Sequence, residues 1–189
     1  MNPHTKFLLV CAEIRDFIKA TGEEIEELNK LLKELEDNQF TRRMRVRVIF
    51  SSIEAHISHL KSSALAFAME KEDVFTEDEH LELNDQRKKS DGRIIENRPT
   101  LKENLKIAFR ALAKSIENGY EIDFGNERAR RFFKAADVRN RITHPKSARD
   151  WDVSESDLEL INGAWIWFGE HLVEVSKYNE VEPADSGNG

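Results

Sequence analysis

Apolar side chains recur along most of the chain at alternating steps of three and four residues. The first run keeps this spacing except at Thr21, and consists of Phe7, Cys11, Ile14, Ile18, Ile25, Leu28, Leu32 and Leu35. Such a stripe covers one face of a helix in a bundle. Residues 21–24 also have the pattern of a helix N-cap around a glycine, which favours a break. We predict one long helix that continues through this joint.

A second stripe begins after Asn38, reaches about Glu70 and consists of Val46, Ile49, Ile53, Ile57, Leu60 and Ala64. It predicts a helix that pairs with the first one as an antiparallel hairpin. Arginines occupy positions 42, 43, 45 and 47 at its start. We interpret Arg43 and Arg47 as a secondary RNA-contact surface, with a purely solvated helix face as the alternative.

Glu54, His56 and His59 follow in the same helix and raise the question of a metal site. His56 and His59 share a helix face, but their spacing is not that of a His-Glu-x-x-His zinc motif, and no second ligand cluster is evident. We therefore predict no metal and no cofactor, and histidines that are partly buried or on the surface. Glu54 is instead a candidate to orient Arg139 from a facing helix.

Three more helices are predicted in the second half of the chain. The third begins with a capping pattern at Thr100 and Glu103 and stops at 118–119. The fourth runs from about 125 to 143, because Pro145 disfavours helical geometry at the residue before it. Its core stripe consists of Phe132, Ala135, Val138 and Ile142. The last begins at 154–156, and its stripe consists of Leu158, Ile161, Trp165, Phe168, Leu172 and Val175.

These patterns predict an all-α fold, an antiparallel helical bundle of about five main helices. We expect one domain at 1–178 and a disordered polar tail at 179–189. A charged insertion lies between helices 2 and 3, at 72–99, where an acidic block precedes a basic one. Thr76 and Glu79 predict the cap of a short helix in this insertion, which we interpret as a lid or a partner contact.

Composition narrows the class of protein. Charged residues make up 34% of the chain, with only eight glycines and four prolines, which favours long helices over a turn-rich β fold. The single cysteine, Cys11, excludes an intrachain disulfide and a multi-cysteine zinc site, and indicates a reducing compartment. The apolar run at 7–12 is too short for a signal peptide or a membrane span. We therefore expect a cytoplasmic protein with no membrane contact.

The net charge of −7 contrasts with one strongly basic segment. Between positions 128 and 149 there are eight lysines and arginines against one acid, a local charge of +7. Such an island is expected where a single patch binds a phosphate backbone. A solvated face of an ordinary helix is the alternative. The candidate RNA contacts of this segment are Arg128, Arg131, Arg141 and Lys146.

Near the end of this segment, residues 139–144 combine a permanent cation, a polar amide and a titratable imidazole within about one and a half helical turns. This combination suits work on phosphodiesters. Phe133, Asn140 and His144 share a helix face away from the core stripe, so we expect that face to meet another surface, most simply a second copy of the same helix. Trp167 also lies off its stripe and either packs, lines an interface or stacks on a base.

The order Arg139-Asn140-x-x-x-His144, late in a helical bundle, resembles the motif of the HEPN superfamily, which are helical-bundle domains of prokaryotic toxins, antiviral defence proteins and RNA-processing enzymes. The resemblance implies a metal-independent endoribonuclease whose composite site forms when two copies meet in a homodimer. It implies that His144 is the general base for the ribose 2′-hydroxyl, that Arg139 holds the scissile phosphate, and that Asn140 orients its partners.

The same resemblance implies a toxin or antiviral-defence effector that is restrained by a neutralising antitoxin protein. The products would be a 2′,3′-cyclic phosphate and a 5′-hydroxyl, and DNA should survive. One alternative is a catalytically inactive HEPN-like module that binds RNA, a nucleotide or a protein through the same face. Another is a helical interaction protein in which Arg139 and His144 make only surface contacts.

Overall fold

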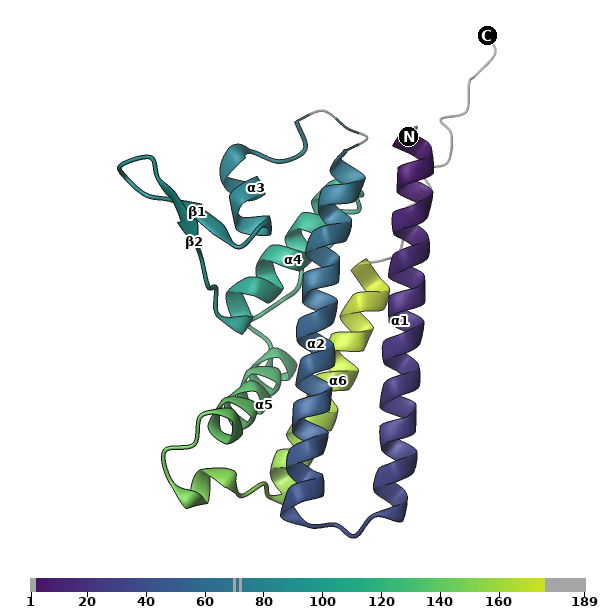
Figure 1. The fold of residues 1–189 in the computed structure, drawn as a ribbon, viewed down its shortest axis with the longest axis vertical. Coiled ribbons are helices and arrows are strands. Elements are labelled where there is room, and N and C mark those ends of the chain that lie inside the picture. The colour runs from purple at the N-terminus through teal and green to yellow at the C-terminus, as the bar shows by residue number, and fades with distance from the viewer. Residues whose placement is uncertain (1–2, 70, 72, 176–189) are drawn as a thin grey trace.

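The chain folds as a helical bundle with one small β-hairpin, in a computed structural model that describes residues 3–69, 71 and 73–175 (Figure 1). The elements are α1 (Pro3–Glu34), α2 (Gln39–Ala68), α3 (Glu77–Leu83), β1 (Gln86–Lys88), β2 (Ile94–Glu96), α4 (Leu101–Ser115), α5 (Glu127–Thr143), the 3₁₀ helix η1 (Ala148–Trp151) and α6 (Glu155–Val175). The all-α class is as predicted. Among the described residues, no helix has both the length and the apolar composition that a bilayer crossing requires. The predicted tail at 179–189 lies outside the described residues.

Helices α1 and α2 form the predicted antiparallel hairpin (Figure 1). α1 is continuous through 21–22, as predicted. Thr21 is buried, because its hydroxyl lies 2.9 Å from the carbonyl oxygen of Phe17 and 3.2 Å from Nε2 of His56 on α2. The predicted stripe is wrong at Ile18 and Leu35, which are exposed. Thr21 belongs to the packed face, and Leu35 follows the last helical residue. The side chains of Phe7, Cys11 and Ile14 are outside the described set.

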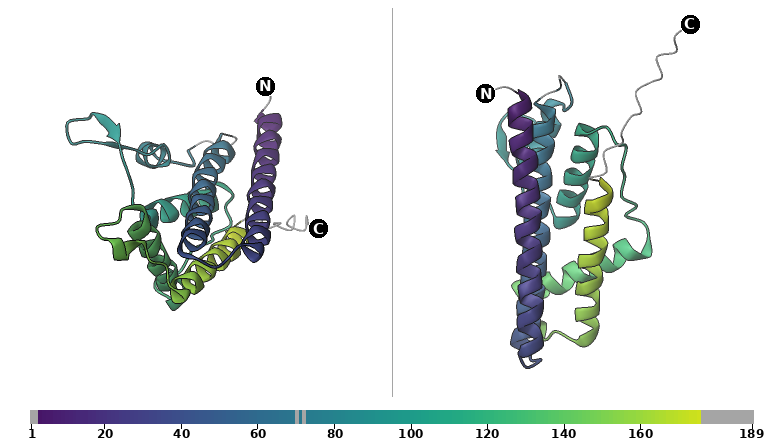
Figure 2. Two further views of the ribbon diagram at one scale, coloured as in Figure 1. Left: turned by 60° about the horizontal axis from the view of Figure 1, so that its bottom comes forward. Right: turned by 90° about the vertical axis from the view of Figure 1, so that its right-hand side faces the viewer.

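Helix α2 is the centre of the bundle. It packs against α1, α4, α5 and α6, and all six residues of its predicted stripe are buried. Asn38 begins the helix as an N-cap whose side chain accepts hydrogen bonds from the backbone of Phe40 and Thr41. Figure 2 shows α1 and α2 on one side of α4 and α6, with α5 crossing the other helices at a steep angle. One hydrophobic core joins α2 to α4, α5 and α6.

The caps of α4 and α5 follow the prediction. Thr100 and Glu103 form the capping box of α4, and the Asn126 side chain caps α5 by accepting a hydrogen bond from the Ala129 amide. Each cap satisfies a backbone N–H that has no partner inside the helix. The predicted core stripe of α5 is buried throughout. This burial fixes the rotation of α5 and therefore the direction in which its other residues point.

Helix α6 decides between the three alternatives for Trp167. Trp167 is only 2% exposed, with its ring centroid 4.7 Å from that of Phe132 and 4.3 Å from that of His171. It is a core residue and not an interface or base-stacking residue. α6 packs against α5 as well as α2 and α4, so its buried arc is wider than a single stripe. Trp165, which lies on the predicted stripe, is half-buried.

The charged insertion contains ordered secondary structure. The predicted cap is confirmed, because Thr76 and Glu79 form the capping box of α3. β1 and β2 pair antiparallel, with Arg87 opposite Ile95, and Gly92 takes a positive φ of 84° in the turn between them. The hairpin projects from the side of the bundle (Figure 1).

A buried lysine anchors this insertion to the bundle. Lys61 on α2 is 4% exposed, and its Nζ donates to Oδ1 of Asp85, at 2.5 Å, and to Oδ1 of Asn104 on α4, at 2.9 Å. Asp85 has a φ of 54° between α3 and β1. A buried ammonium requires such partners, so Lys61 joins three elements at one point.

Candidate functional site

The end of α5 positions the predicted catalytic residues. His144 is the C-cap, with φ −126° and ψ 61°, and its amide donates to the carbonyl of Asn140 at 2.9 Å. Pro145 lacks an amide hydrogen and disfavours helical geometry before it, so the helix ends here. Val138 and Ile142 are buried on the core face of this last turn. They hold the helix end in place while the polar side chains of the motif point elsewhere.

Arg139 is held between two elements. Its Nη2 donates to Oε1 of Glu54 on α2, and its Nη1 donates to Oδ1 of Asn140 at 3.0 Å. The expectation that Glu54 orients Arg139 from a facing helix is therefore confirmed. A guanidinium has five N–H groups. These two bonds leave three of them for another ligand.

Asn140 and His144 are both exposed. Phe133, which shares their helix face, is covered from within the chain: its ring stacks on Phe124 with centroids 6.1 Å apart, and Lys102 Nζ lies 5.0 Å from its centroid. Asp137, which lies on the same face three residues before Asn140, is also exposed, so the open part of this face covers the last two turns of α5. Any surface that meets Asn140 and His144 has to approach at that end of the helix.

The predicted RNA contacts on α2, Arg43 and Arg47, lie beside η1, the segment that follows the end of α5. Nη1 of Arg43 donates to the carbonyl oxygen of Trp151 at 3.1 Å, and its guanidinium carbon is 5.0 Å from the centroid of that indole ring. The guanidinium carbon of Arg47 is 5.9 Å from the same centroid. Arg47 and Glu54 are seven residues apart on α2 and so lie within about 20° of each other around the helix. The structure therefore places the arginines of α2 on the face that carries the Arg139 ion pair.

The segment between α5 and α6 is fixed to the start of α2. The Gln39 side chain accepts a hydrogen bond from the Val153 amide at 2.8 Å and donates to the Val153 carbonyl at 3.1 Å. Asp150 accepts hydrogen bonds from the amides of Lys146 and Ser147, which lower the pKa of its carboxyl group below the usual value. These contacts define the position of η1, and with it the position of Trp151.

The remaining predicted RNA contacts divide into two groups. Arg141 donates to the Asp152 carbonyl at 2.7 Å and to Oδ2 of Asp157 at 2.9 Å, and Lys146 is exposed nearby. Arg128 lies 11 residues before Arg139 on α5, about 16 Å along the helix. There it forms an ion pair with Glu170, and Arg131 is exposed one turn later. Two of the six predicted contacts, Arg141 and Lys146, lie at the helix end that carries the motif. Arg43 and Arg47 share a face of α2 with Glu54 but are offset from it along the axis, and Arg128 and Arg131 lie toward the other end of α5.

We call this end of the molecule the motif surface, defined as Arg43, Arg47, Glu54, Arg139, Asn140, His144, Lys146, Arg149 and Trp151. One of its five cations is neutralised, since Arg139 pairs with Glu54. Arg43, Arg47, Lys146 and Arg149, in contrast, have no carboxylate partner among the described residues. Their positive charge is available to an anionic ligand.

Sequence reasoning missed one residue of this surface. Trp151 is 42% exposed and follows the basic segment by two residues, between Asp150 and Asp152. The two tryptophans for which the sequence predicted a role, Trp165 and Trp167, belong to the bundle helix α6. The sequence signal that could have indicated Trp151 is an aromatic residue two positions after Arg149, outside the predicted helices.

The structure does not make a metal site of the paired histidines. His56 is buried, with Nδ1 2.7 Å from the carbonyl oxygen of Ser52, so Nδ1 carries the proton and Nε2 faces Thr21. Burial lowers the pKa of His56. His59 packs on Phe17 with centroids 3.7 Å apart. Among the residues that the structure describes, no three histidine, cysteine or acidic side chains converge in a way that could hold a metal ion.

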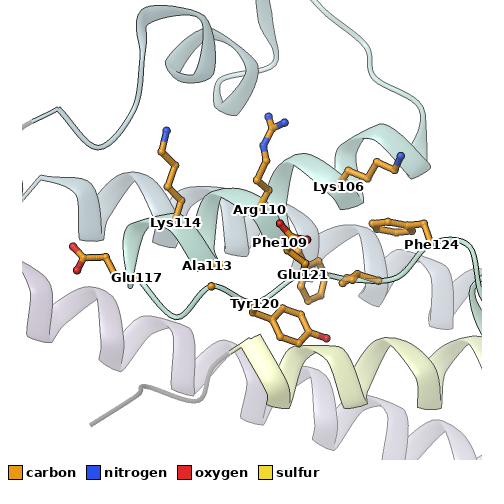
Figure 3. Close-up of a pocket in the computed structure, with 11 residues that line it drawn as sticks. Lys106, Phe109, Arg110, Ala113, Lys114, Glu117, Tyr120, Glu121 and Phe124 are labelled. Atoms are coloured by element: carbon orange, nitrogen blue, oxygen red, sulfur yellow. The ribbon is translucent and has the colours of Figure 1, made fainter. Parts of the chain in front are cut away.

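A pocket of about 610 Å³ lies away from the motif residues, between α4 and 117–124 (Figure 3). Lys106, Arg110 and Lys114 line it from one face of α4. Arg110 pairs with Glu82, and Lys114 pairs with Glu79, both in the insertion. These ion pairs neutralise two of the three cations that line the pocket from α4. The pocket is therefore a weaker anion site than the motif surface.

Comparison of the chain with protein-family models, with curated proteins and with solved structures finds no match. The functional argument therefore depends on the residues of the motif surface.

Proposed function

We propose that this chain is a metal-independent endoribonuclease of the HEPN type, acting as a homodimer through the end of α5. The observation that carries the proposal is the arrangement of Arg139 and His144 at that helix end. The guanidinium of Arg139 is held by Glu54 and Asn140 with N–H groups to spare, and the exposed imidazole of His144 follows five residues later at the C-cap of the same helix. Lys146, two residues after His144, has no carboxylate partner among the described residues.

In the proposed reaction, neutral His144 removes the proton from a ribose 2′-hydroxyl, and the 2′-oxygen attacks the adjacent phosphorus. The bond to the 5′-oxygen breaks, which leaves a 2′,3′-cyclic phosphate. The departing oxygen takes a proton from a solvent water and becomes a 5′-hydroxyl, and the hydroxide that remains takes the proton held by His144. Arg139 donates to the phosphoryl oxygens, where negative charge increases in the transition state. Asn140 keeps the guanidinium in its orientation.

The proposal includes a cytoplasmic toxin or antiviral-defence role and a neutralising antitoxin protein. A ribonuclease that is toxic to its own cell has to be inhibited until it is needed, and the charged insertion offers a surface for the antitoxin protein. Overexpression should then arrest growth, and the His144→Ala variant should not.

An RNA-binding module without catalysis is the second candidate. It is favoured by the ion pair between Arg139 and Glu54, because a guanidinium that is already neutralised holds a phosphate less strongly. The two candidates differ in a measurable product.

The test is incubation of the purified protein with mixed RNA in excess chelator. The enzyme hypothesis predicts fragments with 2′,3′-cyclic phosphate ends and no cleavage of DNA of the same sequence. His144→Ala should lose at least about 100-fold in rate, the usual contribution of a general base. Light scattering should show the same oligomeric state for the variant as for the wild type. Binding of RNA without cleavage would contradict the enzyme and support the module.

A further inference from the structure

Trp151 is an aromatic side chain that the proposed reaction does not use. It ends η1 and is 42% exposed, whereas Trp167 is buried in the core. An exposed indole presents a large apolar surface to water, which is unfavourable unless a partner covers it. The neighbours of Trp151 indicate what kind of partner that is.

Two cations lie over this ring. Arg43 donates to the backbone carbonyl of Trp151 and places its guanidinium 5.0 Å from the ring centroid, while that of Arg47 is 5.9 Å away. Both come from α2, one turn apart, so they approach the indole from the side of that helix. Neither has a carboxylate partner among the described residues. The ring is thus held in place. Asp150 and Asp152 flank Trp151 in the chain, but neither forms an ion pair with Arg43 or Arg47 among the described residues.

We propose that Trp151 is a stacking platform for an unpaired base of single-stranded RNA, and that Arg43 and Arg47 bind the phosphates on either side of that base. The inference rests on the proposed function for its ligand, and adds a subsite to it. An indole stacks on any base because every base has a π-face, and arginine binds phosphate with two parallel N–H groups. A duplex has its bases stacked internally and offers none of them to the ring.

The position of the platform relative to the motif supports a role in substrate binding. Arg47 and Glu54 share a face of α2 and are about 10 Å apart along its axis. Glu54 holds Arg139. A strand with one base on Trp151 therefore has its backbone directed along the same face toward Arg139. The platform selects unpaired RNA and presents a nearby phosphodiester to the motif.

A purely structural role for Trp151 makes a different prediction. Arg43 also joins η1 to α2, and under a purely structural role this contact serves only to fix that segment. In that case removal of the indole would lower stability, or disturb all RNA binding equally. It would not separate unpaired RNA from duplex RNA.

The experiment measures binding by fluorescence anisotropy to a labelled oligouridylate of about 12 nucleotides with 2′-O-methyl groups, which cannot be cleaved. A blunt duplex of the same length is the second probe. The full chain is compared with Trp151→Ala, with Trp151→Phe, which keeps an aromatic face, and with Ile94→Ala, a control at another exposed apolar residue. Circular dichroism checks that each variant is folded.

Trp151→Ala should weaken binding of the single strand about 5- to 150-fold, the effect of losing one stacked base. Binding of the duplex should change less than about twofold, and Trp151→Phe and Ile94→Ala should keep most of the affinity. Equal losses for both probes, no loss, or no binding of the single strand by the wild type would overturn the platform. Platform-dependent binding without any cleavage by the wild type would instead overturn only the nuclease. Cleavage that Trp151→Ala leaves unchanged, with unchanged binding, would overturn only the platform.

Discussion

Arg139 shows how one ion pair can matter more for geometry than for stability. Its partner Glu54 is on another helix, and both side chains retain contact with water. Such a pair contributes less than about 1 kcal/mol to folding. It does restrict the rotamers of a long side chain, and a catalytic arginine needs that restriction before a phosphate arrives.

Substitution of Glu54 separates these two effects. We expect Glu54→Ala to change the free energy of unfolding by less than about 1 kcal/mol. It should lower the rate of RNA cleavage about 10-fold or more, because Arg139 loses its support. Glu54→Gln keeps an oxygen acceptor at the same place and should retain more activity than Glu54→Ala. Urea unfolding and initial cleavage rates give the two quantities, and full activity in Glu54→Ala would show that Arg139 needs no support.

Two histidines predict how stability depends on pH. Burial lowers the pKa of His56 and of His171, and the latter hydrogen-bonds with the Tyr120 hydroxyl inside the bundle. An unfolded imidazole has a pKa of about 6.5. As the pH falls through that value, the unfolded chain binds protons that the folded chain does not. The free energy of unfolding should therefore decrease on acidification, by at most about 1.4 kcal/mol per pH unit for each histidine.

Urea unfolding between about pH 7 and pH 5 measures this decrease. His171→Phe places another aromatic ring beside Phe109 and Trp167 and removes one of the two titrating groups. The variant should lose less stability on acidification than the wild type. Parallel curves for the two proteins would show that His171 does not contribute.

At the level of elements, the sequence predicted the helix ends that are determined by residues close together in the chain. The capping boxes at Thr76 and Thr100 are complete within four residues, so the starts of α3 and α4 could be read directly. The end of α5 depends on Pro145 alone. Glu54 was predicted as a polar residue that orients Arg139 from a facing helix, but no local pattern along the chain indicates that contact.

The missed features depend on residues far apart in the chain. Trp151 is held by Arg43, which precedes it by 108 residues, and no local pattern indicates that contact. Trp167 is buried because α6 packs against several helices, which periodicity along one helix does not reveal. Thr21 is buried because His56 on α2 lies beside its hydroxyl. These three positions are determined by tertiary packing.

The anchor of the insertion can be tested at Asp85. Asp85→Asn removes the charge beside buried Lys61, and asparagine tolerates the positive φ of this position. We expect the free energy of unfolding to fall by about 1–2 kcal/mol. Lys61→Met should cost less, because a buried ion pair can be replaced by an apolar side chain of similar shape. Urea unfolding gives the free energy of unfolding of each variant. Asp73→Asn is the matched control, because Asp73 is exposed and has a φ of 58°.

A control variant as destabilised as Asp85→Asn would attribute the effect to the backbone position and not to Lys61. A larger loss in Lys61→Met would mean that the ion pair itself stabilises the fold.

For the whole molecule, the proposed composite site predicts complementation between inactive variants. Arg139→Ala and His144→Ala should each be inactive alone. If each site takes Arg139 from one copy and His144 from the other, mixing and refolding them gives half mixed dimers with one intact site of two, or about a quarter of wild-type activity. The cleavage rate of the refolded mixture measures this. A mixture as inactive as its components would place both residues of a working site on one chain.

Helix α2 separates two surfaces that different partners can use. Arg43 is near its start and Lys61, which holds the hairpin, is 18 residues later, about 27 Å along the axis. A regulatory protein that grips only the hairpin would leave the opposite pole of the molecule uncovered. If the proposed homodimer forms, effective inhibition from that side therefore has to reach around the bundle or separate the two copies.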